Sequence, residues 1–263
     1  MSTSRLIIEH DGPVLSITLN RPDVHNAFDE LLIEELLTAV MDFSFDDSAR
    51  VLILSGSGKS FCAGADLDWM RRMSNYSREE NIEDAFKLRT MLSGIHRTPK
   101  PIIAKVHGAA MGGGAGLVAA AHIAIASPSA TFAFSEVKLG LVPAVISPYV
   151  IRKIGPANAE ALFVTGERFD AERALRIGLI HEVAEDLDAA VDAKVKHILA
   201  AGPKAVAKSL ELVHQVEVTS ERDAADYTVQ TIADLRASDE GREGISAFLE
   251  KRKPNWVVDQ DSK

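Results

Sequence analysis

Apolar runs and amphipathic stretches take turns along the chain, which predicts an α/β protein. Apolar runs at about 5–9 and 14–19 flank an Asp-Gly pair and predict a β-hairpin. The runs at 51–56 and 101–108 are short and almost unbroken, as in strands buried on both faces. We therefore expect strands at these four places, with helices between them.

The amphipathic stretches have helical spacing and recognisable helix starts. They predict helices over about 30–42, with Asp29 as the N-cap, and over 78–96, opened by Ser77. A third helix, apolar on all sides, is expected over about 113–121.

The later part of the chain changes character. Short strands are expected at 122–127 and 131–134, and from about 147 the pattern is mostly helical to the end. The sequence thus predicts a core over 1–199 and a helical region over 200–263, which serves as a cap or an oligomer interface.

A strand, a loop of small residues and a helix follow one another twice. "VLIL" leads to "CAGADL", and "IIAKV" leads to "GGGAGL". A unit used twice in this way favours a stacked or spiral α/β arrangement.

Composition narrows the class of protein. The 263 residues are 46% hydrophobic and carry a net charge of −9, which argues against a broad nucleic-acid surface. The only cysteine, Cys62, cannot form an internal disulfide. No signal-peptide pattern and no run of 18 apolar residues is visible, so we expect a cytoplasmic enzyme or binding protein.

The stretch "MGGGAGLVAA" (111–120) places three glycines between a strand and a helix. Glycines there allow a tight turn, or the close approach of a ligand to backbone N–H groups at a helix start. Two such starts would form an oxyanion hole if they converge. A dinucleotide site is the rival interpretation, since Gly114, Gly116 and Ala119 match its fingerprint and Glu136 follows at the expected distance.

Five ordered motifs carry a resemblance to a known family: "NRPDVHNAF" (20–28), "FCAGADL" (61–67), "HGAAMGGGAGL" (107–117), "SEVKLGLVP" (135–143) and "FLEKRKP" (248–254). In order and spacing they resemble the crotonase, or enoyl-CoA hydratase/isomerase, superfamily. The resemblance implies a spiral of repeated ββα turns followed by a C-terminal helical region that builds trimers, often paired into hexamers.

The resemblance also implies where an acyl-CoA thioester binds. The backbone N–H groups of Ala65 and Gly113 would form the oxyanion hole. The residues expected to contact CoA are His25, Ala27, Ala63, Asp66, Leu67, Phe248 and Lys251. The residues alone leave an alternative for three of them: Asp66 as a helix cap, His25 as a solvated loop residue and Lys251 as part of a solvated charge run.

Hydratases of this family use two glutamates, and this chain keeps one of them. Gly116 stands at the first position and Glu136 at the second. Because Glu136 follows an apolar strand, we expect a half-buried general acid/base with a raised pKa, although a surface pair with Lys138 is the alternative. Asp66, Asp68 or a bound water are candidates to replace the missing group.

The segment after this motif suggests a branch of the family. Residues 144–148 resemble hydratases that act on carboxylated enoyl-CoAs such as methylglutaconyl-CoA or its isohexenyl analogue. A distal substrate carboxylate would want a cation or hydroxyl, for which Ser147, Tyr149 and Arg152 are candidates; helix packing is the other explanation for each.

The expected function is a lyase that adds water to, or removes it from, the C2=C3 bond of a short or branched enoyl-CoA. No metal is implied, because no His/Cys/Asp cluster has ligand spacing. No cofactor is expected beyond the CoA of the substrate. The alternatives are a Δ3-Δ2 enoyl-CoA isomerase that uses a single glutamate and a non-catalytic acyl-CoA-binding relative.

Overall fold

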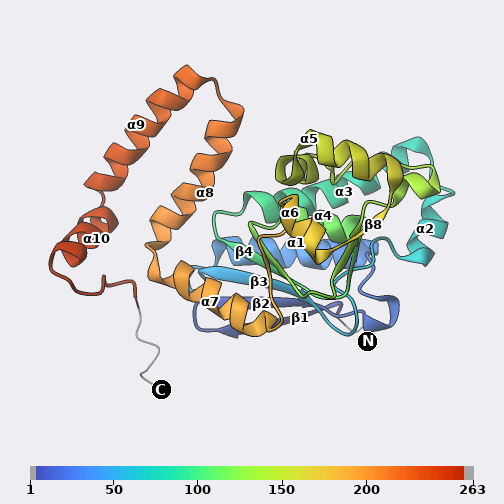
Figure 1. The fold of residues 1–263 in the computed structure, drawn as a ribbon, viewed down its shortest axis with the longest axis horizontal. Helices are drawn as coiled ribbons and strands as arrows, with labels where there is room; N and C mark the ends of the chain where they lie inside the picture. Colours follow the sequence, from blue (N-terminus) through green and yellow to red (C-terminus); the bar gives the residue numbers. More distant parts are fainter. Residues whose placement is uncertain (1–3, 258–263) are drawn as a thin grey trace. The chain divides into compact units, whose positions relative to one another are not determined.

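The computed structural model describes residues 4–257, which fall into two compact units (Figure 1). The first unit runs to Thr98 and resumes over Ile102–Val191. The second consists of Pro99–Pro101 and the chain from Asp192 onward. All the strands that the structure describes belong to the first unit.

A six-stranded sheet with the order β1-β2-β3-β4-β6-β9 forms the centre of the first unit. Its strands are β1 (Leu6–Asp11), β2 (Val14–Leu19), β3 (Val51–Gly56), β4 (Ile102–Val106), β6 (Ile123–Ala126) and β9 (Glu182–Val183). β1 and β2 form the predicted antiparallel hairpin, and every later pair is parallel. β4 is almost wholly buried, as its unbroken apolar sequence predicts.

A second, three-stranded sheet has the order β5-β7-β8. Its strands are β5 (Ala109–Met111), β7 (Thr131–Ala133) and β8 (Arg168–Asp170). Phe132 and Phe169 stack across the β7–β8 pair with ring centroids 5.7 Å apart. The described chain after 147 is mostly helical, as expected, but β8 and β9 were not predicted, because runs of two or three residues are too short to show a period.

Helices surround these sheets in the first unit. They are η1 (Pro22–Val24), α1 (Glu30–Phe45), α2 (Leu67–Met73), α3 (Arg78–Arg97), α4 (Gly113–Ala120), η2 (Glu136–Leu139), α5 (Ser147–Thr165), α6 (Ala171–Arg176) and the start of α7 (Leu187–Ala200). The predicted caps are confirmed: the Leu32 N–H donates to the Asp29 side chain, and Ser77 forms a capping box with Glu80. α4 is buried along nearly its whole length, which fits its apolar sequence.

The second unit is helical. It contains the rest of α7 followed by α8 (Pro203–Val218), α9 (Glu221–Ala237) and α10 (Asp239–Leu249). Large apolar side chains stand exposed on it: Val213, Val216, Val218, Val229, Ile232, Ile245, Phe248 and Leu249. The predicted role of 200–263 in oligomerisation stays a prediction. Among the described helices of either unit, none has the length and apolar character needed to cross a membrane.

Candidate active site

Two loops bring the N–H groups of Ala65 and Gly113 close together. Phe28 holds the first loop through two 2.7 Å hydrogen bonds, from its own N–H to the Gly64 carbonyl and from the Asp66 N–H to the Phe28 carbonyl. A Cβ added to Gly64 would lie 4.0 Å from the Gly113 nitrogen. Within residues 4–257, neither the Ala65 nor the Gly113 N–H donates to a protein acceptor. Both groups are therefore available to an oxygen atom of a ligand.

The three consecutive glycines are required by backbone conformation at the first position and by close packing at the next two. Gly112 has φ 50°, a conformation that favours glycine. A Cβ on Gly113 would lie 2.9 Å from the Phe28 ring, and one on Gly114 would lie 2.2 Å from the Cys62 carbonyl oxygen. The glycine run thus lets α4 begin against the neighbouring loop, with the Gly113 N–H at its first turn.

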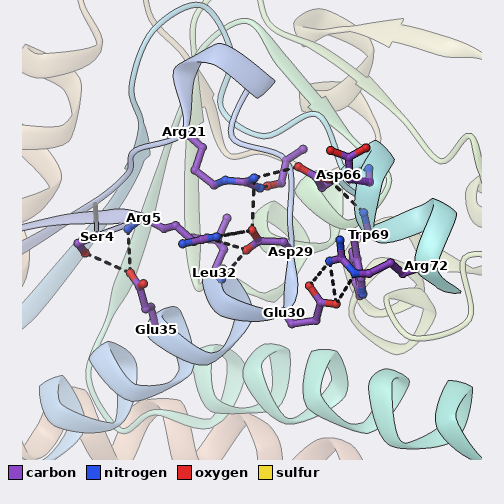
Figure 2. Close-up of polar contacts among 12 residues, drawn as sticks. Ser4, Arg5, Arg21, Asp29, Glu30, Leu32, Glu35, Asp66, Trp69 and Arg72 are labelled. Carbon is purple, nitrogen blue, oxygen red and sulfur yellow. Dashed lines mark hydrogen bonds and ion pairs between the residues drawn. The ribbon is translucent and has the colours of Figure 1, made fainter. Parts of the chain in front are cut away.

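A buried ion network fixes the first loop (Figure 2). Arg21 lies between Asp29 and Asp66, with its Nη2 atom 3.3 Å and 2.9 Å from their carboxylate oxygens. Arg5 also binds Asp29, at 2.8 Å. Asp66 accepts the N–H groups of Asp68 and Trp69 and so caps α2. The network therefore ties the loop that carries Ala65 to the start of α1 and to α2.

Glu136 begins η2, with two residues between it and the end of β7, and turns its carboxyl towards the glycine run. A Cβ on Gly112 would lie 3.3 Å from its Oε1 atom. The Oε2 atom is buried and has no hydrogen-bond partner in the part of the chain that the structure describes. Burial raises the pKa of this carboxyl above its ordinary value, while a backbone hydrogen bond opposes that shift only in part. A half-buried carboxyl with an unpartnered oxygen is suited to accept a proton from a bound molecule.

One cavity of about 240 Å³ joins these groups. Its lining residues are Phe28, Ala65, Trp69, Met73, Asn81, Asp84, Ala85, Leu88, Gly113, Glu136, Val142, Pro143, Ala144, Val145 and Ile146. The two free N–H groups and the Glu136 carboxyl therefore belong to the same, largely apolar space. An apolar pocket with a few convergent polar groups is typical of a small-molecule site.

An isoleucine occupies the space that a side chain at position 116 would need. A Cβ on Gly116 would lie 2.3 Å from the Ile146 Cγ2 atom. Neither Asp66 nor Asp68 lines the cavity: Asp66 is in the ion network, and Asp68 is an exposed partner of Arg71. The same close packing of Gly114 and Gly116 against protein atoms removes the main support for a dinucleotide site.

The predicted CoA contacts in the first unit lie on and beside the first loop. His25 is exposed, has φ 53° and pairs through Nδ1 with the Ser60 hydroxyl at 3.0 Å. The Ala63 N–H donates to the His25 carbonyl, so the two segments are joined. Ala63 and Leu67 are exposed and Ala27 is buried. Their contacts with CoA stay a prediction.

Phe248 and Lys251 belong to the second unit. Phe248 is 81% exposed at the end of α10, and Lys251 has φ 56° just after it. Their predicted role at the CoA nucleotide also stays a prediction.

The candidates for a distal substrate carboxylate do not line the cavity. Ser147 donates to the Ala144 carbonyl at the start of α5. Tyr149 packs edge-on against the His96 ring, and Arg152 lies 2.6 Å from His96. The structural partners of these three residues are Ala144, just before α5, and His96 on α3, in agreement with the packing explanation.

Sequence reasoning missed several residues that shape the site. Arg21 and Asp29 were not assigned to it, although a motif with two charges beside apolar positions could have indicated a buried pair. Trp69, Asp84 and Ile146 line the cavity from elements far apart in the sequence, and no local pattern indicates this.

The remaining chemical groups near the site are structural. Cys62 is fully buried, and burial raises the pKa of its thiol to about 12, so a reactive thiolate is disfavoured. Within residues 4–257, no three His, Cys, Asp or Glu side chains are grouped so that they could hold a metal ion. That the reaction needs no metal or cofactor stays a prediction.

Comparison with known proteins gives the class of this protein. Residues 9–259 match the model of the enoyl-CoA hydratase/isomerase family. A crotonyl-CoA hydratase from Syntrophomonas wolfei is 32% identical over 98% of this chain and 99% of that protein. The chain belongs to the enoyl-CoA hydratase/isomerase family, and its α/β fold is the crotonase fold expected from its motifs.

Solved structures and a second relative extend the comparison. The crystal structure of an enoyl-CoA hydratase from Shewanella pealeana has a TM-score of 0.93 and 42% identity, with 96% of each chain covered. A trans-2-decenoyl-[acyl-carrier-protein] isomerase from Streptococcus mutans is 29% identical over 98% of this chain and 99% of that protein. The relatives therefore include hydratases as well as an isomerase.

Proposed function

We propose that this protein is an enoyl-CoA hydratase that adds water across the C2=C3 bond of a short or branched enoyl-CoA, or removes it. The observation that carries the proposal is the shared cavity. A half-buried carboxyl, Glu136, and two N–H groups that have no acceptor among residues 4–257, those of Ala65 and Gly113, line one apolar space. Such a site suits an acyl thioester. The N–H groups would bind its carbonyl oxygen, and the carboxyl would transfer a proton at the carbons next to the carbonyl group.

The reaction follows from these groups. The thioester oxygen accepts hydrogen bonds from the Ala65 and Gly113 N–H groups, and each is worth about 3 kcal/mol to the developing enolate. Glu136 takes a proton from water as the water oxygen bonds to C3, and the electron pair of the double bond moves onto the thioester oxygen. The enolate then takes a proton at C2 from the carboxyl of Glu136, which restores the carboxylate.

A Δ3-Δ2 enoyl-CoA isomerase is the second candidate. One observation favours it: Ile146 fills the space beside Gly116, so the second glutamate of two-carboxylate hydratases has no counterpart there. Glu136 would then move one proton from C4 to C2 without any water. The isomerase relative from Streptococcus mutans supports keeping this candidate.

Heavy-oxygen water separates the candidates. With crotonyl-CoA we expect label at C3 of the product, and we expect Glu136→Gln to reduce kcat about a thousandfold because the general base is lost. Turnover of only a 3-enoyl-CoA, with no label, would establish the isomerase. Tight binding of CoA esters without any turnover, unchanged in Glu136→Gln, would leave a non-catalytic binding protein.

The finer features belong to the same proposal. We expect His25, Ala27, Ala63, Asp66 and Leu67 to line the path of CoA, without a metal or a further cofactor. We also expect homotrimers or dimers of trimers in the cytoplasm. The exposed apolar side chains of the second unit support an interface, since a single chain leaves them in water.

A further inference from the structure

Besides Glu136, the cavity lining has two polar side chains from α3, and we call the part that they line the polar end. Asn81 and Asp84 are three residues apart on this helix and both line the cavity. The ionisable side chains of the lining are Asp84 and Glu136, and among the described lining residues none is Lys, Arg or His. Glu136 lies beside the glycine run, whereas Asp84 comes from α3. The otherwise apolar pocket therefore has a second ionisable group at a different place in its lining.

Asp84 is held in place by Trp69. The indole N–H of Trp69 donates to the Asp84 Oδ1 atom at 3.3 Å. Trp69 is itself only 3% exposed, and its backbone N–H is fixed by the Asp66 cap. One carboxylate oxygen is thus engaged, while Oδ2 has no hydrogen bond from the described residues.

Asn81 presents the same polarity to the cavity. Its amide nitrogen donates to the carbonyls of Tyr76 at 3.2 Å and Ser77 at 2.9 Å, which uses both of its N–H groups. Its side-chain oxygen is left as an acceptor. The polar end therefore offers acceptors and no free side-chain donor.

A polar end that offers only acceptors should bind an acyl chain that carries a hydrogen-bond donor more tightly than a plain alkyl chain. An alkyl tail would remove water from Asp84 without replacing its hydrogen bonds, which disfavours binding. A tail that ends in an O–H group would supply the missing donor. This is the chemistry that an alcohol and a protonated carboxylic acid share.

We propose that the cavity selects acyl chains whose far end carries a proton-bearing oxygen, and that Asp84 is the specificity-determining residue that accepts its hydrogen bond. The inference rests on the proposed function for the position of the thioester at Ala65 and Gly113. It assigns the recognition of a polar tail to α3, in place of Ser147, Tyr149 and Arg152, which do not line the cavity.

The two sources of an O–H group differ in their proton balance. An alcohol brings its own proton at any pH. A carboxylate tail must take up one proton, shared with Asp84, as in other carboxyl pairs. The surroundings favour that uptake: burial raises the pKa of Asp84 and the nearby Glu30 carboxylate adds to the shift, against the Trp69 hydrogen bond and Lys87. Arg72 is engaged with Glu30, and Glu136 is the other carboxyl of the cavity.

Saturated thioesters of equal length test this without any turnover. Calorimetry with the full-length protein compares valeryl-CoA, 5-hydroxyvaleryl-CoA and glutaryl-CoA. We expect 5-hydroxyvaleryl-CoA to bind about tenfold more tightly than valeryl-CoA at all pH values. If carboxyl tails are also accepted, glutaryl-CoA binding takes up one proton and weakens about tenfold per pH unit on the alkaline side.

Substitutions at Asp84 assign the preference. Asp84→Leu should remove the advantage of 5-hydroxyvaleryl-CoA and keep valeryl-CoA binding, which also shows that the variant is folded. Asp84→Asn should keep much of the alcohol preference, because its carbonyl still accepts, and should abolish the proton uptake with glutaryl-CoA. Asp68→Asn is the matched control, since Asp68 is exposed and pairs with Arg71.

The outcomes separate this inference from the proposed function. Equal binding of the alkyl and hydroxyalkyl thioesters by the unmodified protein, or an unchanged ratio in Asp84→Leu, overturns the inference. Crotonyl-CoA hydration is measured on the same preparations. Selective binding without hydration would refute the hydratase and leave the role of Asp84 standing.

Discussion

The two N–H groups of the site are delivered by two helix starts that are built differently. α2 begins at Asp66, whose carboxylate caps the helix and binds Arg21 at 2.9 Å (Figure 2). α4 begins at Gly112, which has φ 50° and no side-chain cap. One start is fixed by charge, and the other by the absence of side chains.

The difference shows that one proposed catalytic feature, the pair of N–H groups, can rest on two kinds of interaction. A start fixed by charge loses stability when its carboxylate is protonated or removed. A start fixed by steric fit is insensitive to pH, but it cannot accept one additional carbon atom. Cys62 connects the two, because the Met111 N–H donates to its carbonyl at 2.9 Å and its own N–H donates to Ala109 at 3.0 Å.

The largest effect is expected from a methyl group at the steric start. In Gly114→Ala the new Cβ would lie 2.2 Å from the Cys62 carbonyl oxygen, so the two loops must separate. We expect a loss of about 3 kcal/mol in the free energy of unfolding. We also expect kcat to fall about a hundredfold, because the Gly113 N–H is displaced. Urea unfolding and steady-state kinetics measure the two effects.

Gly94→Ala is the matched control for that change. Gly94 lies inside α3, where a Cβ would make an ordinary 3.5 Å contact with Leu37. We expect a gain of about 1 kcal/mol in stability and no change in kcat. If Gly114→Ala behaves like Gly94→Ala, the close fit of the glycine run is not what positions the N–H group.

The pH dependence of the reaction should follow Glu136 and neither helix start. Burial raises the pKa of Glu136, and this proposed base must be ionised to accept a proton from water. We therefore expect kcat/KM to fall about tenfold per pH unit below that raised pKa. The profile of Asp66→Asn should have its acid limb at the same pH. If the acid limb of the profile shifts in Asp66→Asn, the group that titrates belongs to the ion network and is not Glu136.

A smaller effect on stability is expected from Asp66→Asn. Burial raises the pKa of the Asp66 carboxyl, but hydrogen bonds from the Trp69 N–H, Arg21 and the Asp68 N–H outweigh it, so the net pKa is lowered. The ionised carboxylate therefore stabilises the fold above the unfolded pKa of about 4, and this contribution is lost as the pH falls through the lower folded pKa.

We expect Asp66→Asn to lower the free energy of unfolding by about 2 kcal/mol at pH 7. This difference from the unmodified protein should disappear at acid pH. Urea unfolding at several pH values measures it. Asp68→Asn, which removes an exposed ion pair with Arg71, should stay within about 0.5 kcal/mol. A difference in stability that persists at acid pH would show that shape, and not charge, fixes the start of α2.

The smallest effect is expected at Cys62, between the two starts. Its thiol is fully buried with a pKa of about 12, so the thiolate that reacts with disulfide reagents is scarce. We expect no labelling of the native protein and complete labelling in denaturant. Rapid labelling under native conditions would mean that the two loops open readily.

Local sequence predicted the elements that have a clear period or a clear cap. The hairpin β1–β2, the buried strands β3 and β4, and the helix caps Asp29 and Ser77 agree with the structure. β8 and β9 were missed because strands of two or three residues are determined by the neighbours with which they pair, and not by their own pattern. The glycine run and the burial of Glu136 were also expected from the residues around them.

The sequence by itself determined the fold class, the family and the two loops that carry the N–H groups, because glycines, caps and apolar periods act over a few residues. The tertiary structure decided what fills and closes the site. Ile146 occupies the space beside Gly116. Asp84 reaches the cavity from α3, and the indole N–H of Trp69 donates a hydrogen bond to it. These contacts join residues of separate elements, and only their packing brings the side chains within reach of one another.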